Sequence, residues 1–322
     1  MLKRLKDYYL DKRQRFREKV CAPVVFFVMD HAGFRRHLPY THTGDDAQRL
    51  IFDRLTADAP CMIGRIGCTE IRSMECTLHR NSTWLQKLKW RLTMHQTGKS
   101  KKLLKAWVSA DHPDDAFFES FTRMMMHDIE ELDVFAAWRW EETEVFKAPY
   151  DFDVIGLGDL EPFFSKVPWT SALRGRKVLV VLPFVKTVEY QYQRRENLFE
   201  DPNILPEFDL QTYMPFFRGV RDDFELDWFG RLDRMKREIS DLDFDIALIA
   251  AGSYGFPLAA HIKRLGRKSV MMGGVLQLLF GIRGARWDAS KVYQKFYNEY
   301  WIRPGDEYKP KGFHKFDGGC YW

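Results

Sequence analysis

The chain lacks the motifs and long apolar segments that identify several common classes of protein. No segment approaches the roughly 18 uninterrupted apolar residues that a transmembrane helix needs. The longest apolar runs, at 178–184 and 246–251, have only the length of a strand. No apolar segment follows the basic N-terminus, so we expect no secretory signal. The absence of H-E-x-x-H, G-x-S-x-G and G-x-G-x-x-G argues against a zinc protease, a serine hydrolase and a dinucleotide-dependent oxidoreductase.

Cysteine is scarce and irregularly spaced. The 322 residues include five cysteines, namely Cys21, Cys61, Cys68, Cys76 and Cys320. An odd number without any C-x-x-C pair favours neither a disulfide framework nor a zinc site. We therefore expect reduced thiols and a cytoplasmic location.

Basic charge is concentrated at the start of the chain. Residues 1–20 contain eight lysines and arginines against three acids, and this excess equals the net charge of +5 of the whole chain. Because aromatic residues such as Tyr8 and Phe16 lie among the basic ones, we expect a separate helix that makes a peripheral contact, and an anionic membrane surface is one candidate for what it contacts. Packing of this helix on the domain or on a neighbouring subunit is the alternative. No second basic stripe supports binding of nucleic acid.

Helix signals and short apolar runs alternate along residues 21–322. The expected strands are at 61–65, 132–137, 152–156, 177–182, 208–213, 244–250 and 269–272. The expected helices include 44–56, 69–79, 111–127, 186–199, 223–240 and 254–265. Strands that are apolar throughout are buried on both faces. The pattern therefore predicts one Rossmann-like α/β domain, with a mostly parallel sheet, helices on both of its faces and a helical insertion at about 80–130.

The most informative segment joins the strand at 61–65 to the next helix. Its turn contains Gly67, and Glu70 lies in the first turn of the helix. Glycine lets the backbone approach a ligand closely, a helix N-terminus favours a diphosphate, and Arg65 is suited to the same phosphates. Two interpretations are open. Glu70 binds a metal or ligand hydroxyls, or it only complements the helix dipole while Arg65 pairs with a carboxylate.

A second glycine-bearing turn follows the strand at 244–250. Gly252, Ser253 and Gly255 precede a helix, so their N–H groups and the serine hydroxyl are candidates for binding a phosphate. The segment is neither a Walker A motif nor a dinucleotide motif. An ordinary tight turn is the alternative.

A third turn of this kind follows the strand at 269–272. Gly273 precedes an apolar helix, in which the polar Gln277 should have a hydrogen-bond partner. The loop that follows contains Arg283 and Arg286, whose guanidinium groups are candidates for binding phosphates. The alternative is a buried helix with an arginine-rich turn.

Two acids follow the strand at 152–156. Asp159 and Glu161 are candidates for the general base that accepts the proton of an acceptor hydroxyl, provided that desolvation raises the pKa of one of them. The start of a capped helix is the alternative.

The first and third turns together resemble the GT-D fold glycosyltransferases of bacterial surface-glycan clusters. That family has an Arg-Phe/Ile-Gly-Asp-Gly-Glu turn, to which Arg65-Ile66-Gly67-Cys68-Thr69-Glu70 is similar. The segments at 251–255 and 271–274 look like the glycine-bearing turn and strand end near the family's C-terminus, and the similarity spans roughly residues 45–290.

The resemblance implies a GT-D-like fold, a nucleotide-sugar donor and a divalent cation, Mg²⁺ or Mn²⁺. It implies transfer of the sugar to a hydroxyl of a glycan or of a lipid-linked glycan, in the biosynthesis of a capsule or exopolysaccharide at the inner membrane face. Glu70 corresponds to the family's acid for metal and donor. The donor would be surrounded by Arg65, Gly67, Gly252, Ser253, Gly255, Gly273 and Arg283.

Cys68 stands where the family has an aspartate. A neutral thiol is a poor ligand for hard cations such as Mg²⁺ or Mn²⁺. Arginine side chains are therefore candidates to neutralise the diphosphate instead. The alternative function is a non-catalytic scaffold that binds a nucleotide sugar or a glycan in a biosynthetic complex.

Overall fold

The computed structural model describes residues 37–79, 114–146, 149–217, 219–223, 225–315 and 317–322. The expected basic helix at 1–20 and most of the expected insertion at 80–130 lie outside these residues. No helix in the described part of the chain is both long enough and apolar enough to cross a membrane.

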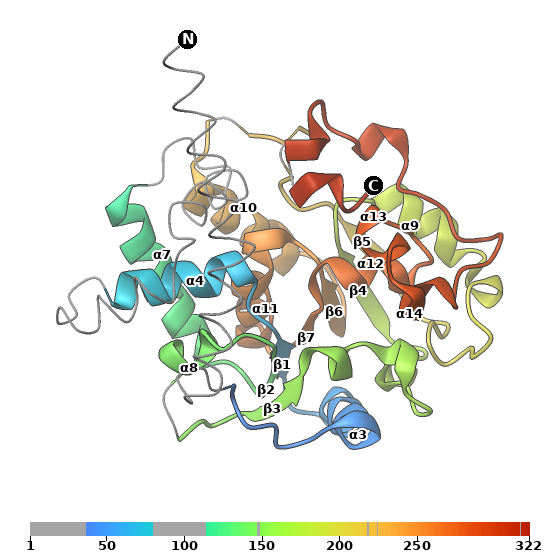
Figure 1. Cartoon of the computed structure of the whole chain (residues 1–322), viewed down its shortest axis with the longest axis horizontal. Coiled ribbons are helices and arrows are strands. Elements are labelled where there is room, and N and C mark those ends of the chain that lie inside the picture. Colours follow the sequence, from blue (N-terminus) through green and yellow to red (C-terminus); the bar gives the residue numbers. More distant parts are fainter. Residues whose placement is uncertain (1–36, 80–113, 147–148, 218, 224, 316) are drawn as a thin grey trace, which may run out of the picture.

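Seven strands form one sheet, and each lies within two residues of its expected position (Figure 1). They are β1 (Cys61–Gly64), β2 (Val134–Ala137), β3 (Asp153–Gly156), β4 (Lys177–Val181), β5 (Asp209–Tyr213), β6 (Ile246–Ile249) and β7 (Lys268–Met271). Their order is β3-β2-β1-β7-β6-β4-β5, and every pairing is parallel. The prediction of a parallel-sheet α/β fold is confirmed.

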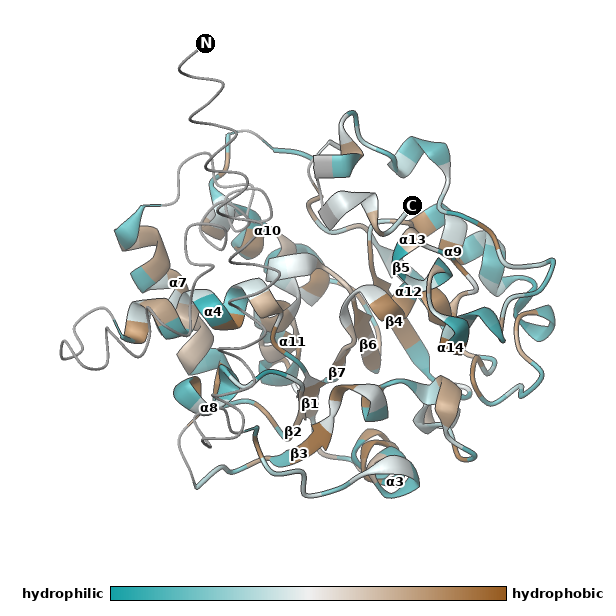
Figure 2. Cartoon of the chain, viewed as in Figure 1, coloured by the Kyte–Doolittle hydropathy of each residue, from teal (hydrophilic) through white to brown (hydrophobic). Residues whose placement is uncertain are grey.

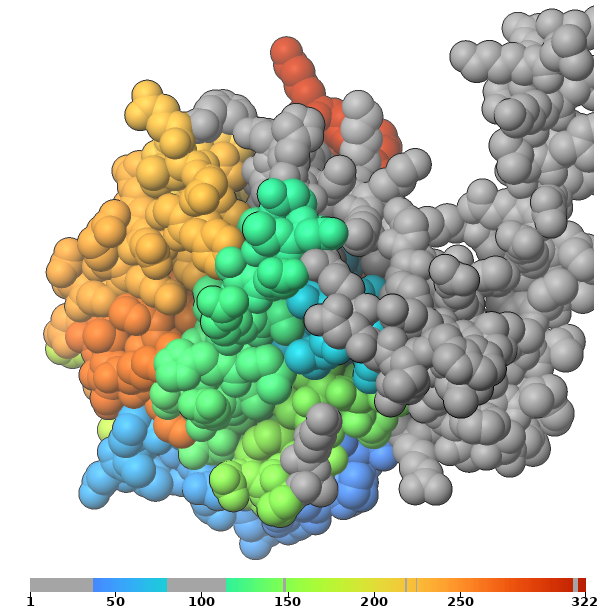
Figure 3. Space-filling view, turned by 90° about the vertical axis from the view of Figure 1, so that its left-hand side faces the viewer, coloured from blue at the N-terminus to red at the C-terminus, as the bar shows by residue number. Residues whose placement is uncertain are grey.

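Helices cover both faces of this sheet. The helices are α3 (Gly44–Thr56), α4 (Cys68–Leu78), α7 (Asp115–Ile129), α8 (Glu142–Val145), α9 (Val185–Tyr192), α10 (Trp228–Ser240), α11 (Gly255–Arg264), α12 (Leu276–Leu279), α13 (Ala285–Asp288) and α14 (Lys291–Gln294). Helices α4, α7, α10 and α11 bury one face, and α3, α9 and α12 bury the other. Figure 3 shows α7, α10 and α11 packed side by side on the outside of the first layer.

Short 3₁₀ turns connect many of these elements. They are η2 (Leu157–Leu160), η3 (Pro162–Phe164), η4 (Trp169–Leu173), η5 (Arg195–Asn197), η6 (Gly252–Tyr254), η7 (Gly273–Val275), η8 (Asp306–Tyr308), η9 (Phe313–Lys315) and η10 (Asp317–Gly319). Two of them, η2 and η3, occupy the segment that contains Asp159, where the sequence allowed a capped helix.

Alternation along the strands divides the core into two layers. In β4, Val178 and Val180 belong to one buried cluster, and Leu179 and Val181 belong to the other. Side chains alternate between the two faces of a strand, so a strand covered on both faces must be apolar at every position. β4 and β6, in the interior of the sheet, are correspondingly mostly brown in Figure 2, whereas the edge strand β5 (Asp209–Tyr213) is more polar and only partly buried. Burial of each such side chain contributes roughly 1.5–3 kcal/mol to the free energy of unfolding.

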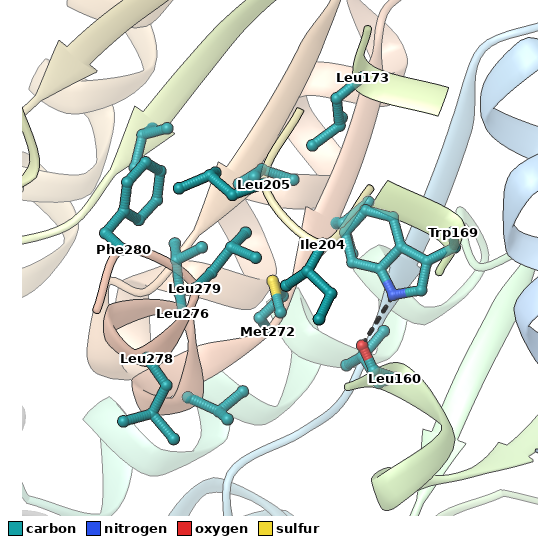
Figure 4. Packing of buried hydrophobic residues seen from close by; sticks show 14 of the residues in the cluster. Leu160, Trp169, Leu173, Ile204, Leu205, Met272, Leu276, Leu278, Leu279 and Phe280 are labelled. Atoms are coloured by element: carbon teal, nitrogen blue, oxygen red, sulfur yellow. Dashed lines mark hydrogen bonds between the residues drawn. The ribbon is translucent and has the colours of Figure 1, made fainter. Parts of the chain in front are cut away.

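A large indole anchors the layer that holds α12. Trp169 is fully buried, and its Nε1 donates a hydrogen bond of 2.9 Å to the carbonyl of Leu160 (Figure 4). Leu276 and Leu279 of α12 belong to the same cluster. Burial of Leu276 and Leu279 in this cluster anchors α12, and with it the turn that joins β7 to that helix.

The chain leaves the ends of β1 and β7 toward opposite faces of the sheet. These two strands are neighbours, with Gly64 paired to Met271 at their carboxyl ends. After β1 the chain enters α4, which packs on one face, and after β7 it enters η7 and α12, which pack on the other. In parallel α/β sheets such a divergence leaves a crevice in which ligands bind.

Capping of α10 gives a test of local stability. The Asp227 side chain accepts a 2.7 Å hydrogen bond from the N–H of Gly230, which would otherwise lack a partner at the helix start. We expect Asp227→Ala to lower the free energy of unfolding by about 1 kcal/mol in urea titrations. Asp241→Ala removes an exposed aspartate beyond the other end of α10 and should change it by less than about 0.5 kcal/mol. Equal effects of the two substitutions would contradict the capping role.

Candidate functional site

A cavity of about 220 Å³ lies at the carboxyl ends of the strands. The three glycine-bearing turns after β1, β6 and β7 converge on it, because these strands are adjacent or nearly adjacent in the sheet. Six predicted site residues line the cavity: Arg65, Gly67, Glu70, Gly252, Ser253 and Gly273. Four predicted site residues do not: Asp159, Glu161, Gly255 and Arg283.

The guanidinium group of Arg65 lies directly against the backbone of Gly273. A Cβ atom at Gly273 would be only 1.8 Å from Nη2 of Arg65, and the φ angle of Gly273 is +71°. Both the contact and the dihedral therefore require glycine at this position. The buried Nε of Arg65 has no hydrogen-bond partner among the described residues. A buried donor of this kind is costly unless a ligand or water accepts from it.

Glu70 lies at the N-terminus of α4 with its carboxylate folded back over Gly67. A Cβ atom at Gly67 would be 2.1 Å from Oε2 of Glu70, so glycine is needed for this close approach. A carboxylate here also complements the helix dipole. Glu70 nevertheless lines the cavity together with Cys68. Its position at the helix N-terminus is therefore compatible both with an interaction with the helix dipole and with binding of a ligand.

The turn after β6 supplies backbone and a hydroxyl to the cavity. Gly252 has a φ angle of +55° and is exposed, whereas Ser253 is buried. The Oγ of Ser253 accepts a 3.0 Å hydrogen bond from Nε1 of Trp228, so its own proton is available to a ligand. Gly255 has a packing role, because a Cβ atom there would lie 2.9 Å from Cε of Met271.

Arg286 of α13, and not Arg283 of the preceding loop, lines the cavity. The guanidinium of Arg286 lies 4.9 Å from the ring centre of Tyr321, which also lines the cavity. Arg283 instead faces Asp288, with an N–O distance of 3.5 Å, and lies over the ring of Tyr297. Arg283 lies in the loop before α13 and Arg286 lies in the first turn of that helix, so their opposite orientations follow from tertiary packing.

Gln277 has the hydrogen-bond partners that its position in an apolar helix requires. Its Nε2 donates to the carbonyls of Ile282 and Tyr321 at 3.2 and 3.3 Å. These bonds hold the segment that contains Tyr321 against the turn after β7. Tyr321 packs so closely on Gly274 that a Cβ atom there would lie 2.5 Å from the ring.

The two candidate bases after β3 have structural partners away from the cavity. The carboxylate of Asp159 accepts from the backbone N–H groups of Gly44 and Gly156, at 3.0 and 3.3 Å. Glu161 is buried, and its Oε2 accepts a 2.7 Å hydrogen bond from the hydroxyl of Tyr293. Burial raises the pKa of Glu161 to about 7, although the bond from Tyr293 opposes this shift.

The sequence analysis missed the aromatic walls of the cavity. Trp138 follows β2 and is held by a 3.1 Å hydrogen bond from its Nε1 to the carbonyl of Ile66. Its backbone N–H donates to the buried carboxylate of Glu142 at 3.1 Å. At the other end, Phe216 and Phe217 follow β5 and contribute an apolar wall. Each aromatic residue follows a strand in sequence, but no local pattern showed that these strand ends border one cavity.

The charged side chains that line the cavity are Arg65, Arg286 and Glu70. This set has a net positive charge and suits an anionic ligand. It does not fit a cage for Mg²⁺ or Mn²⁺, because it includes a single carboxylate and the neighbouring Cys68 offers sulfur. In the described part of the chain, no group of three or more His, Cys, Asp or Glu side chains is arranged to hold a metal ion.

Comparisons with protein families, curated proteins and solved structures find no match to this chain.

Substitution of Gly273 tests the contact with Arg65. We expect Gly273→Ala to destabilise the protein by more than the about 1–2 kcal/mol that a left-handed backbone costs alanine, because Arg65 must also move. Gly175→Ala is the matched control, since Gly175 has a φ of +69° with open space around its α-carbon. The excess is the destabilisation by Gly273→Ala beyond that by Gly175→Ala, measured by urea unfolding. In a background that carries Arg65→Ala this excess should disappear, and the cost of the left-handed backbone should remain. An excess that persists in the double variant would contradict the contact.

The free energy of unfolding should depend on pH, because Glu142, which accepts from the N–H of Trp138, is buried. Burial raises the pKa of the Glu142 carboxyl to about 8, partly opposed by hydrogen bonds from the backbone. The unfolded carboxyl loses its proton near pH 4.5, so the contribution of Glu142 to the unfolding free energy falls as the pH rises from about 4.5 to 8. The slope approaches about 1.4 kcal/mol per pH unit within that window.

Glu142→Gln should remove this slope, because an amide does not ionise and its oxygen still accepts from Trp138. The measurement is the difference in unfolding free energy between wild type and Glu142→Gln, from urea titrations at pH 5 to 8. Glu161, whose pKa is also raised, contributes equally to both proteins and cancels from this difference. Glu200→Gln controls for the loss of one exposed carboxylate. A difference between wild type and Glu142→Gln that is constant with pH would show that Glu142 is already ionised in the folded protein.

Proposed function

We propose that this chain is a GT-D-like glycosyltransferase that moves a sugar from a nucleotide-sugar donor to a hydroxyl of a glycan or lipid-linked glycan. The observation that carries the proposal is the buried, unpartnered Nε of Arg65 in a cavity at the crevice between β1 and β7. A crevice of this kind is where parallel α/β sheets bind nucleotides. The resemblance of residues 65–70 to the GT-D turn supports the same conclusion.

In this proposal Arg65 and Arg286 bind the donor diphosphate. Arginine suits the role because its charge is permanent and its planar fork matches phosphate oxygens. Ser253, with its proton available, and the N–H groups of the turn at Gly252 add hydrogen bonds to the same anion. The ring of Trp138 lines the same cavity, where it can stack on a base or a sugar of the donor.

Glu70 is the general base of the proposed reaction, because it is the single carboxylate that lines the cavity. Its carboxylate accepts the proton of the acceptor hydroxyl while that oxygen bonds to the anomeric carbon. The bond between the anomeric carbon and the diphosphate oxygen breaks, and the nucleoside diphosphate leaves with the electron pair. The arginines stabilise the negative charge that develops on the leaving group.

The residues of the cavity do not fit the divalent cation that the GT-D resemblance implies. No step of the proposed reaction therefore uses a metal ion, and Arg65 and Arg286 neutralise the charge of the diphosphate instead. A cytoplasmic location at the inner membrane face, in surface polysaccharide biosynthesis, is part of the proposal.

Arg65 is the first target for a binding test. A thermal-shift screen of nucleotide sugars, with and without Mn²⁺ and with excess EDTA, should identify a ligand that stabilises the protein in EDTA. At about 100 times its Kd the ligand should add about 2.7 kcal/mol. Arg65→Gln should weaken its binding at least tenfold by calorimetry, because a charged hydrogen bond to phosphate is lost. Arg283→Gln is the matched control and should retain affinity, since Arg283 faces Asp288 outside the cavity.

Glu70 is the target for a test of catalysis. We expect Glu70→Gln to abolish transfer, measured as nucleoside diphosphate released in the presence of acceptor, while donor affinity changes less than threefold. Its unfolding free energy should fall by at most about 1 kcal/mol, the value of a favourable charge at a helix N-terminus. Donor binding without transfer in the wild type, for every acceptor tried, would favour the scaffold function instead. Full transfer by Glu70→Gln would exclude Glu70 as the base.

A further inference from the structure

An exposed apolar and basic surface lies where η3 meets α14. We call it the Phe164 surface, and it consists of Phe164, Lys166, Val167, Lys291, Val292 and Lys295. Phe164 is 43% exposed, Val167 47% and Val292 54%. None of these six residues lines the cavity.

Aromatic contacts join the two halves of this surface. The ring of Phe164 lies 5.7 Å from the ring of Tyr293 and 5.7 Å from that of Phe296. The ammonium of Lys295 lies 5.2 Å from the centre of the Phe164 ring. These contacts bring η3 and α14 together, and α14 lies on the right of the molecule in Figure 1. The surface is therefore a feature of the folded domain.

The positive charge of the Phe164 surface has little compensation. Lys166, Lys291 and Lys295 are exposed, and none forms an ion pair within 4 Å with a described residue. The acids that face these elements are engaged elsewhere. Asp288 pairs with Arg303 and Arg283, and Glu161 accepts from Tyr293.

Asp45 also lies beside this surface, next to the segment that follows η3. Its carboxylate accepts hydrogen bonds from the hydroxyl of Ser165 and from the N–H of Lys166. These bonds and the nearby Lys166 hold the pKa of Asp45 below its ordinary value. Of the three lysines, Lys166 is the one that lies beside this carboxylate.

We propose that the Phe164 surface binds an anionic lipid membrane. Exposed aromatic and aliphatic side chains enter the boundary between headgroups and acyl chains, and lysines beside them are attracted to anionic headgroups. The long lysine stems allow the ammonium groups to reach the headgroups while the apolar side chains are immersed. Charge complementarity and exposed apolar groups occur together on this one surface.

The same features disfavour a second copy of the chain as the occupant. Lysine is depleted from the centres of protein interfaces. A two-fold interface centred on this surface would bring like-charged lysines together, which is unfavourable. A membrane-binding surface is independent of the proposed transferase activity, and of the prediction for residues 1–20.

The test measures binding of the full chain to sedimented vesicles. One set of vesicles contains phosphatidylcholine with about a third of anionic phosphatidylglycerol. The other set is pure phosphatidylcholine. Wild type should partition to the anionic vesicles and lose binding as salt is raised. The variant Lys166→Gln, Lys291→Gln, Lys295→Gln should lower the partition coefficient at least tenfold, since each lysine near the surface contributes about fivefold. Phe164→Ser with Val167→Ser should also lower it at least tenfold.

Matched controls remove similar groups elsewhere. Arg123→Gln, Arg237→Gln, Lys311→Gln removes three exposed charges, and Tyr190→Ser with Leu265→Ser removes two exposed apolar side chains. Residues 1–20 are retained in all proteins, so any contribution from them is common and cancels in the ratio.

Two results would overturn the proposal. One is binding by either variant of the Phe164 surface that equals that of its control. The other is a change from dimer to monomer in sedimentation velocity with vesicle binding unaffected, which would assign the surface to a second copy. Neither result bears on donor binding by Arg65, so the membrane proposal and the transferase proposal can fail separately.

Discussion

The pairing of β1 with β7 is the constraint on which the candidate site depends. Two strands that are distant in sequence end at the same height, with Gly64 beside Met271, and the chain then departs from them toward opposite faces. Gly64 itself leaves little room, since a Cβ atom there would be 3.1 Å from Cβ of Met271. Because the ends of β1 and β7 are so close, the side chain of Arg65 extends over Gly273. A guanidinium group therefore lies where the chain diverges toward the two helical layers. The position of Arg65 in the cavity follows from this one neighbour relationship.

Much of the fold could be predicted from the sequence, because buried parallel strands must be apolar at every position. The strand expected at 177–182 is present at Lys177–Val181, and the helix expected at 44–56 has those bounds. Boundaries were less certain where several residues could cap a helix. The helix expected from 223 begins at Trp228, since Asp227 and not an earlier aspartate provides the cap. The segment expected at 186–199 divides into α9 and η5.

The candidate site could be predicted only in part, because its geometry depends on strand order. Glycines after β1, β6 and β7 were recognisable locally, and these turns do meet. Asp159 carries the same local signal of an acid after a strand, but β3 is at the edge of the sheet. Arg283 and Arg286 could not be distinguished, since no sequence signal showed that a short helix begins between them, at Ala285. Partners that are distant in sequence, such as Gly273 for Arg65, are fixed by topology alone.

The distance along the chain between Arg65 and Tyr321 has a consequence for folding. Both line the same cavity, so it is complete only after nearly the whole described chain has assembled. Sites built from such non-local contacts form slowly, because the entropy of closing large loops is lost before the contacts form. A ligand that contacts both residues stabilises the complete fold and no smaller unit of it.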